Sequence, residues 1–429
     1  MVKNTQNLVK RQIFSEIARH LEAPEITLII GPRQVGKTTL LLTQLKDHLI
    51  KKGYPENKIL VFNLDVITEL DLFTSQQKFI NFLKERIGRG KLFVFIDEAQ
   101  RVENAGIFFK GIYDLDLPVK FVLTGSSTLE IKAKIHESLT GRKRIFHLYP
   151  FTFKEFLSFW DTSLAKLISQ KEISSYSKER IIEYLFTFVN WGGYPRIALE
   201  TNISEKQEIL KEIYSSYIEK DIIGFLKIKN HTAFTNLVSF LSAQIGQLVN
   251  TNELSQSLKT ERKTIEKYLE ILEKTFIIKR ILPFFRNPRK ELTKMPKIYF
   301  TDTGIRNFAL NSFNDFDSRQ DKGTLLENFI FSEICKQTNT QLRFWRTKEK
   351  AEVDFVLTNY AGIILPIEVK AISLKSPQIS RSFRSFITHY QPKKALIVNL
   401  GFQGKMKLKK TNIYFIHPYE IGRILATNL

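Results

Sequence analysis

Eight consecutive residues near the start of the chain combine two glycines, a lysine and a hydroxyl: Gly31-Pro32-Arg33-Gln34-Val35-Gly36-Lys37-Thr38. In a loop of the form G-x-x-x-x-G-K-[ST], inward-pointing backbone N–H groups cradle phosphates at a helix N-terminus. The lysine reaches the β- and γ-phosphates, and the hydroxyl binds Mg²⁺. We therefore expect these residues, together with Thr39, to bind ATP, and Thr38 to hold Mg²⁺.

A second motif places two carboxylates at the end of an apolar run. Residues 92–96 are Leu-Phe-Val-Phe-Ile, and Asp97 and Glu98 follow them. Such a run predicts a central parallel strand, and ligands of α/β sheets bind at the carboxyl ends of the strands. We expect Asp97 to hold Mg²⁺ through its water shell and Glu98 to orient or deprotonate the attacking water. Alternatively, either carboxylate alone serves as a helix cap or a solvated residue.

Two further polar segments are candidates for contacts with phosphate. Thr124, Ser126 and Ser127 follow the apolar run 121–123, where hydroxyls can sense the γ-phosphate; a simple Gly-Ser turn is the alternative. Arg142 begins a cationic triplet and is the candidate for a sensor or finger arginine. Surface solvation is the alternative for this residue.

Near the other end of the chain, charged residues interrupt two apolar segments. Residues 352–357 and 363–370 predict a hairpin, and centring it on Ala361 places Asp354 opposite Glu368. Lys370 shares a face with Glu368, because strand side chains alternate. Charges on apolar strands are costly unless they bind a metal or pair with one another.

The spacing of Asp354, Glu368 and Lys370 is similar to the D…E-x-K pattern of the restriction-endonuclease-like fold. That similarity implies that the carboxylates hold Mg²⁺ and that the lysine stabilises charge at the scissile phosphate or positions water. Glu327, in a predicted helix over 325–335, stands where this fold often adds another acidic ligand. Two alternatives remain open: a structural salt bridge, or a nuclease-like fold that has lost cleavage.

Between these two regions the pattern is helical and predicts a winged helix-turn-helix. Segments 252–258 and 264–272 form two helical patterns, and the strand-like run 276–282 fits a wing. Arg262, Lys263 and Lys267 would lie near the leading end of the second helix, where they could contact DNA. The spacing of the apolar residues is also what any packed helix needs.

The elements that must position these residues indicate an α/β protein of several domains. Strands are predicted at 26–30, 58–63, 92–96 and 120–123, and helices at 37–52, 76–87 and within 104–113. We expect a P-loop, AAA-like ATPase domain at 1–150, a helical lid or connector at 151–230, a winged helix at 231–290 and a nuclease-like α/β domain at 291–429.

Composition narrows the class of partner. Lys and Arg outnumber Asp and Glu by 65 to 44, giving a net charge of +21, which favours DNA as a partner; a Lys-rich genome is the alternative. The densest basic stretches are 286–297 and 405–410. The single cysteine, Cys335, excludes an intrachain disulfide. We find no secretory signal and no membrane span, so we expect a cytoplasmic protein.

Together these segments resemble the bacterial and archaeal AAA-type ATPases with a C-terminal domain of unassigned function, the AAA_14 plus DUF4143 architecture. The resemblance rests on the strings at 31–38, 95–100, 123–127, 139–142, 192–195 and 217–222. It implies ATP binding and hydrolysis and leaves homo-oligomer formation open, because AAA-type relatives often assemble into rings. The favoured function is a Mg²⁺-dependent ATPase coupled to a DNA-engaging, nuclease-like domain. The alternative is a non-nucleolytic, ATP-dependent switch that controls a protein partner.

Overall fold

The computed structural model describes residues 8–125, 139–170, 172–216, 218, 230–284, 295–338, 340–359 and 361–428. The chain divides into two compact units, Met1–Phe151 and Thr152–Leu429. The segments predicted as connector, winged helix and nuclease-like domain all lie within the second unit. Ser126, Ser127, most of 217–222 and most of the basic stretch 286–297 lie outside the described residues.

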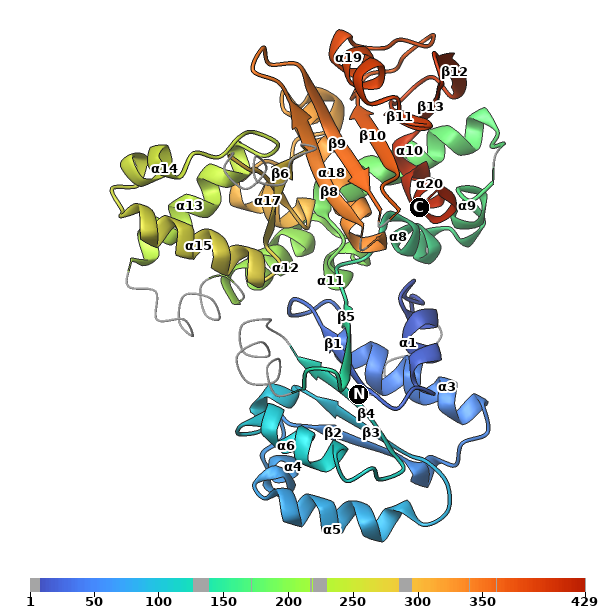
Figure 1. The fold of residues 1–429 in the computed structure, drawn as a ribbon, viewed down its shortest axis with the longest axis vertical. Helices are drawn as coiled ribbons and strands as arrows, with labels where there is room; N and C mark the ends of the chain where they lie inside the picture. Colours follow the sequence, from blue (N-terminus) through green and yellow to red (C-terminus); the bar gives the residue numbers. More distant parts are fainter. Residues whose placement is uncertain are drawn as a thin grey trace. The chain divides into compact units, whose positions relative to one another are not determined.

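The first unit is built on a five-stranded parallel sheet (Figure 1). Its strands are β1 (Ile26–Ile30), β2 (Ile59–Asn63), β3 (Leu92–Asp97), β4 (Val119–Gly125) and β5 (Lys143–His147), in the order β2-β3-β4-β1-β5. Every residue of β1 and β3 is buried, as expected for apolar strands covered on both faces. The four strands predicted from the sequence are confirmed.

Helices and turns precede the first of these parallel strands or connect one strand to the next, as crossover connections require. They are α1 (Phe14–His20), α2 (Lys37–Thr39), η2 (Leu40–Leu45), α3 (Lys46–Lys51), η3 (Glu56–Lys58), α4 (Ile67–Leu70), η4 (Asp71–Phe73), α5 (Gln76–Ile87), η5 (Ala99–Arg101) and α6 (Ala105–Tyr113). From α2 to α3 the helix is continuous, with a π-helical stretch at η2. This confirms the predicted helix at 37–52 and places the loop 31–36 between a buried strand and a helix N-terminus.

The second unit begins with helices and ends with a large mixed sheet. Before the sheet residues come α8 (Phe153–Trp160), α9 (Thr162–Leu167), α10 (Ser175–Trp191), α11 (Pro195–Ala198), α12 (Ile203–Tyr214), α13 (His231–Ala243), α14 (Thr251–Ser257) and α15 (Arg262–Lys274). Later come α17 (Thr303–Ala309), η8 (Phe316–Ser318), α18 (Lys322–Gln337), α19 (Arg381–Tyr390), η9 (Pro418–Glu420) and α20 (Ile421–Asn428). The middle region is therefore helical, as predicted.

The sheet of the second unit contains eight strands in the order β12-β13-β11-β10-β9-β8-β6-β7. These are β6 (Ile278–Pro283), β7 (Lys297–Phe300), β8 (Gln341–Arg346), β9 (Glu352–Thr358), β10 (Ile364–Val369), β11 (Lys394–Val398), β12 (Gly404–Leu408) and β13 (Thr411–Ile416). The strand predicted as a wing, β6, pairs with β7 on one side and with β8 on the other. It therefore belongs to the same sheet as the C-terminal strands.

Two helices cover opposite faces of this sheet. Val356 belongs to a buried cluster that includes Phe383 and Phe386 of α19. The neighbouring Phe355 packs against Phe331 of α18, with their ring centroids 6.5 Å apart. Since successive strand side chains point to opposite faces, α19 and α18 lie on different sides of β9.

Candidate functional site

The loop after β1 has the conformation that a phosphate cradle needs. Gly36 has φ of +91°, in the left-handed region that favours glycine. Lys37 is 5% exposed, and its Nζ donates to the carbonyls of Gly31 at 3.1 Å and Pro32 at 2.8 Å. The ammonium is thus folded back over the loop, where the β- and γ-phosphates of a nucleotide would be held.

Gly31 is required for a different reason. A Cβ at this position would lie 2.0 Å from the Leu148 carbonyl oxygen, which belongs to the segment after β5. No side chain fits at that distance. The first glycine of the motif therefore permits a close backbone approach, whereas Gly36 provides the turn.

The rest of the loop is arranged around these residues. Arg33, Gln34 and Thr39 are exposed, whereas Pro32 and Val35 are buried. Gln34 has φ of 60°, an uncommon conformation for a residue other than glycine. The exposed positions leave the outer side of the loop open to solvent.

The carboxylate at the end of β3 faces the hydroxyl of the loop. Thr38 Oγ1 donates to Asp97 Oδ2 at 2.5 Å, and Thr124 Oγ1 donates to Asp97 Oδ1. Thr124 is in place because β4 lies between β1 and β3 in the sheet. A threonine hydroxyl and a buried carboxylate are oxygen ligands that suit Mg²⁺, so these residues fit the ion that the motif implies.

Glu98 adopts a left-handed backbone conformation, with φ of 55° and ψ of 44°. Its backbone N–H donates to Thr124 Oγ1 at 3.2 Å, and its carboxylate accepts a hydrogen bond from Gln100 Nε2. Left-handed non-glycine residues are strained and concentrate at functional sites. This conformation turns Glu98 away from the direction of the strand, next to Asp97 and Thr124.

The buried ammonium of Lys37 is sensitive to nearby charge. Burial lowers the pKa of the Lys37 ammonium to about 8, while the carboxylates of Glu98 and Asp97 oppose this change. Bound phosphates would add negative charge beside the ammonium and favour its charged form.

Arg11 contacts the phosphate loop but was not among the predicted site residues. It is 6% exposed, and its guanidinium donates to the Val35 carbonyl at 2.8 Å and to the Tyr149 carbonyl at 2.6 Å. It also lies over the Phe151 ring, 4.9 Å from the centroid. Arg11 therefore fastens the phosphate loop to the segment after β5, and no local motif marks it.

The structure does not bring Arg142, the predicted sensor or finger arginine, to the phosphate loop of its own chain. Arg142 precedes β5, and its carbonyl accepts a hydrogen bond from the N–H of Ile26, the first residue of β1. The phosphate loop follows the last residue of β1, so it lies at the carboxyl ends of the parallel strands. Arg142 lies at their amino ends. Its guanidinium pairs with Asp114 at 2.6 Å. A role at the site of a neighbouring copy stays a prediction.

In the second unit, the predicted hairpin register is confirmed. Ile364 pairs with Thr358 and Ile367 with Phe355, and continuing this register places Glu368 opposite Asp354. Asp354 Oδ2 accepts a hydrogen bond from the N–H of Val369 at 2.7 Å. The ammonium of Lys370 lies 2.9 Å from Glu368 Oε1. The structure thus brings these three predicted residues together.

Glu327 of α18 reaches the same region but has partners of its own. Lys297 Nζ lies 3.4 Å from Glu327 Oε1 and 2.5 Å from Glu352 Oε1, and the Tyr299 hydroxyl donates to Glu327. Lys297 and Tyr299 were not among the residues predicted for this site. Their alternation within the short strand β7 was the available signal, because both ionisable groups then share a face of the sheet.

The carboxylates of this cluster influence one another strongly. Burial, followed by the charge of Glu327, raises the pKa of Asp354 well above its ordinary value, with Glu368 adding to the effect and Lys297 opposing it. Glu368 Oε2 is buried and has no hydrogen-bond partner in the described structure. A divalent cation beside Asp354 and Glu368 would relieve both conditions, and Mg²⁺ typically takes one or two protein carboxylates.

The residues do not form a complete metal cage by themselves. Within the described part of the chain, no three His, Cys, Asp or Glu side chains are grouped closely enough to hold a metal ion. The prediction that Glu327 joins Asp354 and Glu368 as a third ligand therefore does not describe this arrangement. The carboxylate of Glu327 instead forms an ion pair with Lys297 and accepts a hydrogen bond from Tyr299.

The candidate DNA-reading helix, α15, is amphipathic. Its Ile265, Leu269 and Leu272 side chains are buried, whereas Arg262, Lys263 and Lys267 are exposed. Arg262 Nε donates to Glu266 at 2.9 Å, so one of the three cationic side chains of α15 is already paired within the helix.

The chain matches three protein-family models. An "AAA domain" (AAA_14) matches residues 23–157, a "Domain of unknown function (DUF8612)" matches 178–315, and a "Domain of unknown function (DUF4143)" matches 322–419. Within the part of the chain that the structure describes, no helix has the length and apolar character needed to cross a membrane.

Several relatives and solved structures are similar to the chain. An uncharacterised protein of Haemophilus influenzae is 27% identical over 76% of this chain and 78% of its own length. One of Methanocaldococcus jannaschii is 28% identical over 78% and 72%. The Walker-type ATPase of Pyrococcus abyssi aligns with a TM-score of 0.44 and 15% identity, covering 71% of this chain and 97% of that one. The ORC2 protein of Aeropyrum pernix in its ADP form aligns with a TM-score of 0.37 and 14% identity, covering 68% and 90%.

The family matches coincide with the two regions described above: the phosphate loop lies inside the AAA match, and the acidic cluster around Asp354 lies inside the DUF4143 match. The chain therefore has the architecture of an AAA-type P-loop ATPase domain with a C-terminal DUF4143 domain.

Proposed function

We propose that this chain hydrolyses ATP with Mg²⁺ and couples hydrolysis to the engagement of DNA by a nuclease-like C-terminal region. The observation that carries the ATPase part is the hydrogen bond between Thr38 Oγ1 and Asp97 Oδ2 at 2.5 Å. It joins the hydroxyl of the phosphate loop to the carboxylate of β3, next to the buried ammonium of Lys37.

Each residue of this group has a defined task in the proposal. Thr38 and Asp97 would hold Mg²⁺, which neutralises charge on the phosphates when it is bound. Lys37 would bind the β- and γ-phosphates. Glu98 would orient the attacking water or accept its proton, and Thr124 would hold Asp97 and the Glu98 backbone in position.

Turnover of ATP by the parent protein tests this assignment. Lys37→Ala should lower turnover by at least roughly a hundredfold, as expected for the loss of a group that stabilises transition-state charge. Lys51→Ala, an exposed lysine at the end of α3 in the same unit, is the matched control and should leave turnover unchanged. Equal turnover in both variants would remove the assignment.

The nuclease-like part rests on the position of Glu368 opposite Asp354, given by continuing the register of β9 and β10, and on the contact of Lys370 with Glu368. The unpartnered Oε2 of Glu368 supports a bound cation. The proposal predicts Mg²⁺-dependent cleavage of duplex, single-stranded or branched DNA that Asp354→Asn abolishes. Asp317→Asn, on an exposed residue of η8, is the control and should cleave like the parent.

A second candidate is a switch that binds DNA or a protein partner without cleaving. The ion pairs of Lys297 with Glu327 and Glu352 favour it, because an ammonium already balances part of the acidic cluster. A parent protein that cleaves none of the three DNA forms, yet changes its ATP turnover when DNA is added, would select this candidate over the nuclease.

A further inference from the structure

One stretch of the C-terminal region is entirely free of acidic residues. Between Glu368 and Glu420 the sequence has no Asp or Glu, and it has ten lysines or arginines. These are Lys370, Lys375, Arg381, Arg384, Lys393, Lys394, Lys405, Lys407, Lys409 and Lys410. Since the whole chain carries a net charge of +21, this short stretch contributes nearly half of the excess.

Helix α19 lies in the middle of this stretch and divides its side chains between two faces. Phe383, Phe386 and Ile387 are buried against the sheet. The opposite face is exposed and lines an open depression with a cavity volume of about 600 Å³. Its lining residues are Arg381, Arg384, Ser385, Thr388 and His389.

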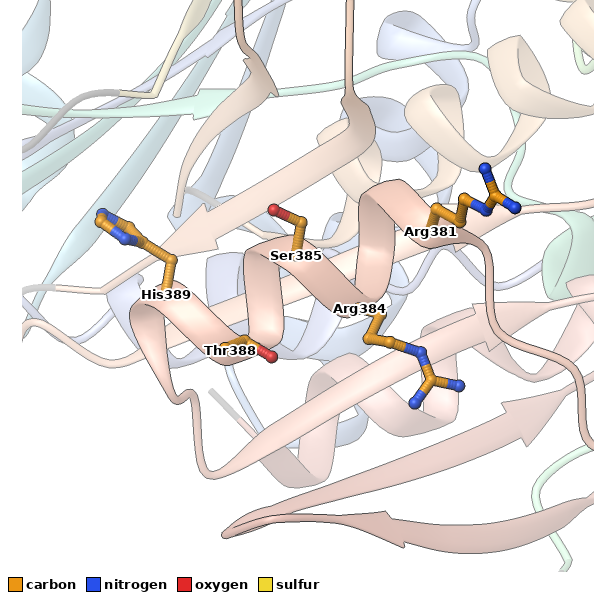
Figure 2. Close-up of a pocket in the computed structure, with 5 residues that line it drawn as sticks. All are labelled: Arg381, Arg384, Ser385, Thr388 and His389. Carbon is orange, nitrogen blue, oxygen red and sulfur yellow. The ribbon is translucent and has the colours of Figure 1, made fainter. Parts of the chain in front are cut away.

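Figure 2 shows how these side chains are arranged. Arg381, Ser385 and His389 follow one another along one side of the helix, and Arg384 and Thr388 along the neighbouring side. Both rows have the four-residue spacing that brings side chains together on a helix surface. The exposed face therefore presents two guanidinium groups, two hydroxyls and an imidazole.

The two arginines are not neutralised by the protein. In the described part of the chain, Arg381 and Arg384 take part in no ion pair and no side-chain hydrogen bond. Exposed arginines elsewhere in the same unit are paired: Arg180 with Glu183 and Arg196 with Glu212. The guanidinium forks on α19 are thus free to bind an external anion.

We infer that the exposed face of α19 binds the phosphate backbone of DNA; this inference rests on the DNA engagement proposed above. Arginine forks match phosphate oxygens in geometry, and serine and threonine hydroxyls are common donors to phosphate. An anionic membrane surface is disfavoured, because a membrane-surface helix inserts an apolar face and that of α19 is buried in the core. The depression is a phosphate-binding surface that positions DNA without reading its sequence.

Binding of the full-length protein to two unrelated duplexes, measured from 50 to 300 mM salt, tests the inference. Arg381→Ala with Arg384→Ala should weaken binding roughly tenfold at low salt, and equally for both sequences, because phosphate contacts carry no sequence information. The slope of log K against log salt should fall by about 1.8, the value for two lost contacts with duplex phosphates. The matched control, Arg180→Ala with Arg196→Ala, removes the same charge from paired positions and should bind like the parent.

Each outcome decides between the claims. If the parent binds both duplexes and the α19 variant binds them equally well, the surface is refuted while the proposed DNA engagement stands. If the parent binds no DNA, both are refuted. If the α19 substitutions reduce binding to anionic phospholipid vesicles but not to DNA, the inference is also overturned. Tryptophan fluorescence like that of the parent confirms that the variants are folded, because Trp160, Trp191 and Trp345 all lie in the second unit with the substituted residues.

Discussion

Lys297 is 2% exposed and lies between two glutamates, 2.5 Å from Glu352 Oε1 and 3.4 Å from Glu327 Oε1. The charge of Asp354 also acts on it. An ammonium in this position does electrostatically what a divalent cation would do in a nuclease-like site. Whether the cluster is an ion-pair network or a metal centre therefore depends on how firmly Lys297 holds its partners.

Replacing Lys297 tests the competition between the ammonium and a cation. Lys297→Met should lower the thermal midpoint of the apo protein, because removing one partner of a buried pair costs roughly 3–5 kcal/mol. It should also strengthen Mn²⁺ binding measured by calorimetry, since an uncompensated carboxylate attracts the ion. Lys297→Met combined with Glu352→Gln restores the charge balance and serves as the control. Mn²⁺ affinity that is the same in all three proteins would contradict a cation site beside Lys297.

At the level of single residues, local motifs predicted the parts of the site that are contiguous in the sequence. The residues of the loop from Gly31 to Thr38, Asp97 and the opposed Asp354 and Glu368 lie where their spacing indicated. Arg11 could not be predicted, because it acts on residues distant in the sequence. For Lys297, the alternation with Tyr299 in β7 was the one local signal, and it does not reveal the distant glutamates that the ammonium contacts. The position of Arg142 could not be predicted either, because the local sequence does not show at which end of the parallel strands this residue lies.

Among the elements, α18 connects the acidic cluster to the start of the second unit. Its Glu333 accepts a hydrogen bond from the N–H of Phe153, the first residue of α8, at 3.1 Å. Burial raises the pKa of Glu333 to about 7 from its ordinary value of 4.5, while Lys336 opposes the shift. The folded state therefore holds this proton more tightly than the unfolded state does.

The sign of the pH dependence follows from this shift. Below pH 4.5 Glu333 is neutral in both states and contributes nothing; between pH 4.5 and 7 the unfolded state ionises first, so the free energy of unfolding falls. Above pH 7 the accumulated loss is about 3 kcal/mol. Glu333→Gln should remove this loss and make the second unit more stable at pH 8, with little change at pH 4.

Urea unfolding followed by tryptophan fluorescence measures this effect in the second unit, because Trp160, Trp191 and Trp345 all lie there. Glu179→Gln, an exposed glutamate of α10, is the control and should keep the pH dependence of the parent. Parallel pH curves for the parent and Glu333→Gln would refute the assigned role of Glu333.

The elements themselves were largely predictable where periodicity is strong and local. The bounds of α5 and β1 agree with the sequence pattern, and the buried strand β3 was expected from its unbroken apolar run. The membership of β6 in the eight-stranded sheet was not foreseen, because its pairing with β8 joins residues 282 and 343. Such long-range pairing leaves no trace in a local window of sequence.

For the whole molecule, we propose that the first unit hydrolyses ATP. The resulting change of bound nucleotide would control the engagement of DNA by the basic second unit. The family matches establish the AAA and DUF4143 regions, and the contact of Thr38 with Asp97 supports the roles proposed within the first. The excess positive charge, concentrated in the stretch around α19, explains why nucleic acid is the favoured partner.

The most direct test of ATP hydrolysis by the first unit separates ATP binding from ATP hydrolysis. Glu98→Gln keeps the shape of the side chain and removes its ability to accept a proton. With Mg²⁺ present it should bind ATP as the parent does, measured by calorimetry, while turnover falls by at least roughly a hundredfold. Lys37→Ala should lose binding as well. If Glu98→Gln turns over ATP at the rate of the parent, the catalytic assignment at the end of β3 is wrong.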